Sequence, residues 1–169
     1  GDLLVSRGDL DAGADCLERS LAEIRDLGMD RAEGNVLGGF GRLELERGNH
    51  ERAREQFERQ REIHGEFDFD RGVAGADRGL GDVARDAGEL DTAVDRYEAS
   101  YERFERIDAP GRALEVADRL VDVADRRDDR EAAVEWCETG REMAADAGLD
   151  DRAEAFTEQL ERLRTAVDD

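Results

Sequence analysis

The sequence predicts an all-α protein, a right-handed α-solenoid in which antiparallel helical hairpins stack in chain order. Three observations lead to this fold class. Turn-forming dipeptides recur with a fixed spacing, apolar residues between them follow the three-and-four spacing of an α-helix, and the alternation typical of strands does not fit. One hairpin cannot bury its own apolar face, so consecutive hairpins must share a core.

The repeat is marked by a turn dipeptide at a constant spacing of 40 residues: Gly8-Asp9, Gly48-Asn49, Gly88-Glu89 and Asp128-Asp129. No insertion interrupts this register, so the chain divides into equal units. The predicted array comprises a partial unit 1–29, units 30–69, 70–109 and 110–149, and a terminal helix 150–169. In this register the chain begins inside a first helix, and Gly8 forms the turn to a second one.

Each full unit is predicted to contain two helices. In unit 70–109 the apolar positions Val73, Ala76, Leu80 and Val83 recur at helical spacing, and a second such set starts at Ala93. Gly28, Gly88 and Gly148 are expected to close helices, and Pro110 to occupy the first turn of the next one. Small residues such as Gly41 and Gly81 let neighbouring helix axes approach closely.

These residues resemble the tetratricopeptide family, whose pattern is matched here by Leu80-Gly81, Gly88-Glu89 and Ala93. The spacing is similar to a longer variety of that repeat. The fourth occurrence of the pattern departs from the first three. There, Val121 replaces the helix glycine and Asp128 replaces the turn glycine. The resemblance implies a scaffold that binds a peptide or protein partner in a concave groove, and no enzyme activity.

By the same resemblance, the first helix of each unit lines the groove. Its nearly balanced charges favour an acidic or mixed-charge partner segment. The alternative is that Arg78 with Asp82, and Asp122 with Arg126, are i,i+4 pairs that only support exposed helices. The predicted groove residues are Arg42, Leu45, Glu46, Arg78, Asp82, Arg85, Asp86, Asp118, Arg119, Asp122, Asp125 and Arg126.

Two other roles stay open at this point. Similar long repeats accompany signalling ATPases and transcriptional regulators, so the chain is alternatively a regulatory or sensor segment of a larger protein. Self-association through unpaired terminal helices is the third hypothesis. Trp136, the single tryptophan, is expected to pack on the terminal helix or else to anchor an interface.

The charge balance restricts the partners. The chain has a formal net charge of −21, and all of its 25 basic residues are arginine. Such an acidic surface disfavours nucleic acid and anionic membranes. Its lack of lysine resembles proteins of organisms that keep molar salt in the cytoplasm, where screening makes the charge tolerable. A cytoplasmic, halophilic protein is therefore expected.

No arrangement of side chains indicates chemistry. His50, in a predicted turn, and His64, near a helix end, have no second His or Cys at metal-binding spacing, so no metal or cofactor is predicted. Cys16 and Cys137 lie far apart and are expected to be buried thiols. Carboxylates are too numerous for any one pair to indicate an acid–base dyad.

The salt hypothesis has a direct test. We expect helix content, followed by far-ultraviolet circular dichroism, to fall as the salt concentration drops below about 1 M, because carboxylate repulsion is then no longer screened. Full helicity in dilute buffer would contradict the interpretation.

Overall fold

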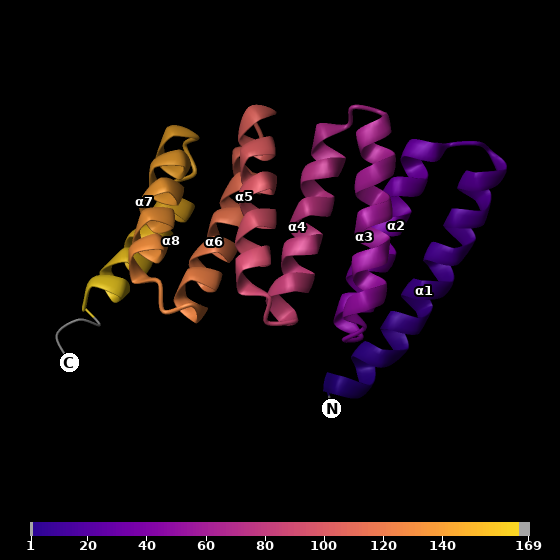
Figure 1. The fold of residues 1–169 in the computed structure, drawn as a ribbon, viewed down its shortest axis with the longest axis horizontal. Coiled ribbons are helices and arrows are strands. Elements are labelled where there is room, and N and C mark those ends of the chain that lie inside the picture. Colours follow the sequence, from indigo (N-terminus) through magenta and orange to yellow (C-terminus); the bar gives the residue numbers. More distant parts are fainter. Residues whose placement is uncertain (1, 166–169) are drawn as a thin grey trace.

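The computed structural model describes residues 2–165, and these residues form α-helices joined by short turns, without a β-strand (Figure 1). Neighbouring helices run antiparallel and stack in chain order, which confirms the predicted α-solenoid. Residues 166–169, the end of the predicted terminal helix, lie outside the described part. The helices are α1 (Asp2–Asp26), α2 (Asp30–Glu46), α3 (His50–Glu66), α4 (Asp70–Asp86), α5 (Leu90–Arg106), α6 (Pro110–Arg126), α7 (Arg130–Asp146) and α8 (Asp150–Thr165).

Each connection bends at a residue with left-handed backbone geometry. Four of these residues are glycines with φ between 63° and 81°, and three are aspartates with φ between 49° and 55°. At Gly48 the backbone N–H donates to Leu45 O at 2.9 Å, and the next N–H donates to Glu44 O at 2.8 Å. This arrangement satisfies the last carbonyls of α2 and reverses the chain within a few residues. The helix-closing glycines predicted at Gly28, Gly88 and Gly148 are confirmed, as is Pro110 in the first turn of α6.

The predicted turn at Gly8-Asp9 is wrong. α1 continues without interruption from Asp2 to Asp26. A glycine inside a helix costs only roughly 0.5–1 kcal/mol relative to alanine, so the dipeptide by itself does not force a turn. The later turns are held by packing between the helices on either side of them, whereas the described part of α1 packs mainly against α2. A related expectation also fails, because His50 is the first residue of α3 and not part of the turn.

Helix pairs approach most closely where glycine faces an aromatic ring. A Cβ added at Gly41 would lie 2.7 Å from the ring of Phe57, and one added at Gly81 would lie 2.5 Å from the ring of Tyr97. Both rings are buried. The next unit has Val121 at the glycine position and Cys137 at the aromatic position, and both are buried in one core cluster. The departure of Val121 from the repeat pattern is therefore matched by a smaller side chain on the facing helix.

One core position between α2 and α4 holds a histidine. The His64 ring has no exposed surface, and a Cβ at Gly34 would lie 2.5 Å from its Nε2. That Nε2 lies 3.3 Å from the carbonyl oxygen of Arg31, while Nδ1 has no hydrogen-bond partner among the described residues. The ring also packs edge-on against Phe69, 5.1 Å away between ring centres. His64 is therefore a core side chain, a place that the sequence analysis did not predict.

Two glycines in α4 provide a matched test of this packing. In Gly79→Ala the new Cβ would lie 2.5 Å from the Phe57 ring, so we expect the free energy of unfolding to fall by about 1–3 kcal/mol. In Gly75→Ala nothing lies within 4 Å, and the gain in helix propensity should stabilise by up to about 1 kcal/mol. Denaturant unfolding of both variants checks the pair, and equal effects would contradict the packing argument.

Candidate functional site

The predicted groove residues lie on alternate helices. Arg42, Leu45 and Glu46 belong to α2, the set from Arg78 to Asp86 belongs to α4, and the set from Asp118 to Arg126 belongs to α6. The structure joins the α4 and α6 sets through the ion pair of Arg119 with Asp82, and Arg78 of the α4 set pairs with Glu115 of α6, which was not predicted. Among the described residues no ion pair joins the α2 set to them. Leu45 packs partly buried against the Phe57 core cluster.

Most charges between α4 and α6 neutralise one another. Arg78 donates to Glu115 at 2.7 Å, and Arg119 Nε donates to Asp82 at 2.8 Å. Arg85 contacts Asp86 at 2.9 Å. The predicted i,i+4 pair of Arg78 with Asp82 is therefore replaced by a contact to the next unit. The pair of Asp122 with Arg126 is present at 3.1 Å.

Asp82 is the centre of this polar network. Besides Arg119, it accepts a hydrogen bond of 2.7 Å from the hydroxyl of Tyr97 and lies 3.5 Å from Arg85. Burial, together with the negative charge of Asp82, raises the pKa of Tyr97 far above its ordinary value, so the phenol stays a donor. Burial likewise lowers the pKa of Arg78, with the charge of Arg119 as a further cause. These side chains stabilise the contact between α4 and α6.

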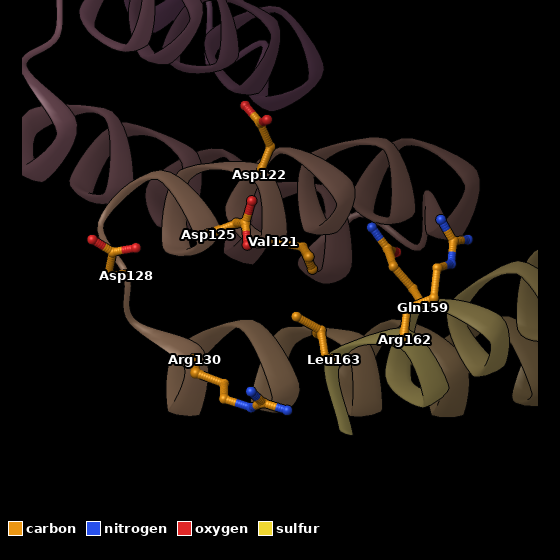
Figure 2. Close-up of a pocket in the computed structure, with 8 residues that line it drawn as sticks. All are labelled: Val121, Asp122, Asp125, Asp128, Arg130, Gln159, Arg162 and Leu163. Carbon is orange, nitrogen blue, oxygen red and sulfur yellow. The ribbon is translucent and has the colours of Figure 1, made fainter. Parts of the chain in front are cut away.

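The contact between α6 and α8 is different. Arg152 of α8 donates to Asp118 at 2.5 Å and stacks 5.5 Å from the centre of the Phe156 ring. Beyond this pair the two helices separate around an open hollow of about 680 Å³ (Figure 2). We call it the α6–α8 hollow, and its lining residues are Val121, Asp122, Asp125, Asp128, Arg130, Gln159, Arg162 and Leu163.

The hollow has an apolar centre with charges around it. In Figure 2, Val121 of α6 and Leu163 of α8 point toward one another across it. Asp125 and Asp128 lie toward the α6–α7 turn, and Arg162 lies at the opposite end on α8. Asp125 and Asp128 form no ion pair within the described part of the chain. The surface therefore offers an apolar contact next to two carboxylates and the Arg130 guanidinium, none of which forms an ion pair within the described part of the chain.

The repeat register explains why the hollow lies here. One unit earlier, Tyr97 extends to Asp82, and Arg119 completes the contact. At the corresponding positions the next unit has Cys137, Asp122 and Gln159. A cysteine is too short to span the gap, and Gln159 brings no charge to Asp122. Among the described residues, the contacts of Tyr97 and Arg119 with Asp82 therefore have no counterpart between α6 and α8.

Sequence reasoning identified Asp122 and Asp125 but missed the contribution of α8. Gln159, Arg162 and Leu163 were not recognised because α8 was treated only as a terminal helix. The signal that could have found them is the step from tyrosine to cysteine at one repeat position. That step removes the hydroxyl that reaches Asp82 in the preceding unit, so it predicts a different contact with the following helix.

Three smaller expectations have definite outcomes. Cys137 is buried as predicted, but Cys16 is exposed, because it lies on a face of α1 that no other described helix covers. Trp136 is half-buried and packs edge-on against Tyr101 of α5 at 5.1 Å, so its aromatic neighbour is not on α8.

The structure also reveals an apolar edge that the sequence analysis did not identify. Leu27, Met29 and Phe67 are exposed large apolar side chains, and all three lie in the α1–α2 and α3–α4 turns. These turns share one end of the stack (Figure 1).

Within the described residues no helix is long and apolar enough to cross a bilayer, and no cluster of His, Cys, Asp or Glu has a metal-binding arrangement.

Comparison with solved structures agrees with this architecture. The crystal structure of BtubC (BKLC) from P. vanneervenii has a TM-score of 0.72 at 18% identity, over 98% of this chain and 77% of that one. A Podosopora anserina putative kinesin light chain with nearly identical TPR-like repeats has a TM-score of 0.50 at 12% identity, over 96% of this chain and 90% of that one. A crystal structure of a single-residue variant of those repeats has the same TM-score and identity, over 95% and 89%.

No protein-family model matches the sequence, and no curated protein matches it. At these identities the likeness concerns the fold. It supports a TPR-like helical repeat.

The two cysteines should differ in reactivity. Burial raises the pKa of Cys137 to about 11, with the charge of Asp118 adding to the shift. At neutral pH we expect a thiol reagent to modify Cys16 rapidly and Cys137 only upon unfolding. Because the pKa of Cys137 is higher in the folded state than in the unfolded state, the buried thiol contributes to the free energy of unfolding below pH about 9. This contribution is lost as pH rises towards about 11. Cys137→Ala should reduce that alkaline loss, and rapid modification of both thiols would contradict the burial.

Proposed function

We propose that the protein is an interaction scaffold that binds a segment of a partner protein in the α6–α8 hollow. The observation that carries this proposal is the hollow itself. Elsewhere along the predicted groove, Arg78, Arg85 and Arg119 are already paired with carboxylates of the same chain. Between α6 and α8 the apolar surface of Val121 and Leu163 and the two carboxylates without an ion pair in the described residues face open space.

The chemistry of the hollow selects the segment. An apolar side chain would cover Val121 and Leu163, and a basic neighbour would meet Asp125 and Asp128. Burial of a single large apolar side chain contributes roughly 1.5–3 kcal/mol, which is enough to make it the anchor of a short segment. This choice departs from the acidic or mixed-charge segment expected from the sequence, since Arg78, Arg85 and Arg119, which favoured it, are paired within the chain.

We further propose that binding takes place in concentrated salt, as expected for an acidic chain of this composition. The apolar contact supports this, because hydrophobic association is strengthened by salts that are excluded from protein surfaces. Screening would weaken the contribution of Asp125 and Asp128 at the same time. Affinity should therefore depend more on Val121 and Leu163 than on the carboxylates.

The repeat provides a variant that closes the hollow. Val121→Gly combined with Cys137→Tyr copies Gly81 and Tyr97 of the preceding unit, where the ring fits over glycine and its hydroxyl reaches Asp82. We expect this variant to fold with unchanged helicity and to lose a partner that the unaltered chain captures from the native host in high salt. Asp125→Arg with Asp128→Arg should weaken the same capture.

The control is Asp15→Arg with Asp26→Arg, two exposed positions on α1 with the same change of charge. It should retain the partner. The variant Val121→Gly with Cys137→Tyr must first show unchanged helicity and melting. If it still captures the partner, the proposed site is refuted. Mass spectrometry of the captured protein, followed by a binding assay with the purified partner, identifies the segment.

A further inference from the structure

A second charged cluster lies on the side of α4 that faces α3 and α5. Its centre is Asp77, whose side chain has no exposed surface. Arg61 of α3 donates its Nε–H to Asp77 Oδ1 at 2.8 Å, and Arg96 of α5 lies 3.4 Å from the same oxygen. Arg103 of α5 lies 3.5 Å from Oδ2. We call these four side chains the Asp77 arginine cluster.

The cluster has more positive charge than the buried carboxylate requires. One well-placed arginine is sufficient to neutralise an aspartate, whereas three surround Asp77. Arg103 also contacts Asp70 at 3.2 Å, and Arg106 contacts that carboxylate at 2.9 Å. Four arginines therefore meet two aspartates, an excess of two positive charges in a chain whose net charge is −21.

The guanidinium groups have donors that the protein does not use. Arg61 and Arg96 each make a single hydrogen bond within the described residues, although a guanidinium has five N–H donors. Their side chains are 43% and 38% exposed, so those donors face solvent. The neighbouring Glu62 does not neutralise them, because its ion pair is with Arg59. Asp77 Oδ2 also has no hydrogen-bond partner in the part of the chain that the structure describes.

The position of Asp77 holds these donors in place. It is anchored on α4, and the arginines reach it from the two flanking helices, so their orientation is set before any ligand arrives. Arginines held in this way suit bidentate contacts with carboxylates, and prior ordering reduces the entropy cost of binding. A long polyanion such as nucleic acid would meet the acidic surface around the cluster, whereas one or two carboxylates would not.

We infer that the Asp77 arginine cluster is a second protein-binding site, which takes glutamate or aspartate side chains of an acidic partner segment. It is independent of the α6–α8 hollow in position and in chemistry. One site selects an apolar and basic segment, and the other selects an acidic one. The array would then hold two different segments, of one partner or of two, on different faces.

Nuclear magnetic resonance of the arginine Nε–H groups tests the inference directly. The probe is a peptide of alternating glutamate and serine, added at the lowest salt concentration that keeps the helices folded. We expect saturable shifts of the Arg61, Arg96 and Arg103 signals and none with the matched glutamine–serine peptide. Arg61→Gln with Arg96→Gln should weaken binding about tenfold or more, since charged contacts of this kind are strong.

Two further variants separate binding from folding. Arg19→Gln with Arg52→Gln removes the same charge from exposed positions on α1 and α3 and should leave affinity unchanged. Asp77→Asn removes the carboxylate that orients the arginines and, as long as its melting shows a folded chain, should weaken binding because that prior ordering is lost. Absence of shifts in the unaltered chain, or equal losses in both arginine double variants, would overturn the site. Equal or larger shifts with inorganic phosphate would overturn its assignment to carboxylates.

Discussion

The close approach of neighbouring helices at glycine is the constraint on which the rest of the structure depends. Gly41 and Gly81 leave room for the rings of Phe57 and Tyr97, and these rings bring adjacent helices into register. The left-handed turn residues reverse the chain at regular intervals and keep the helices antiparallel. Together they convert a local sequence pattern into a continuous stack. Charged side chains then meet across the helices that this stack places together.

Variation within the repeat produces the functional surfaces. Where the aromatic residue is retained, Tyr97 and Arg119 link α4 to α6 through Asp82. Where cysteine replaces it, Val121 fills the glycine position and the α6–α8 hollow opens. The same principle applies at Asp77, a charged residue at a position held by Leu37 and Ala117 in the adjacent units. Both proposed binding surfaces therefore lie at departures from the repeat.

The distribution of charge gives the two surfaces different roles. Most arginines of the predicted groove are paired with carboxylates of the same chain, and these pairs stabilise the contacts between the helices. The excess positive charge is found instead around Asp77, and carboxylates without an ion pair in the described residues lie beside the hollow. The chain has a net charge of −21, yet its surface includes one region with excess positive charge and another with excess negative charge. Two proposed sites with opposite preferences follow from that arrangement, and neither is apparent from the total charge.

The amino-acid sequence alone determined the helices, their turns and their stacking order, because periodic apolar residues and left-handed turn residues act over a few positions. It also indicated which helices carry Arg78, Asp82 and Arg119. Only the tertiary structure decided that Arg78 pairs with Glu115, that α1 is continuous through Gly8, and that Asp77 is enclosed by arginines from two other helices. Such contacts depend on the distance between side chains on different helices. The repeat pattern of the sequence does not specify that distance.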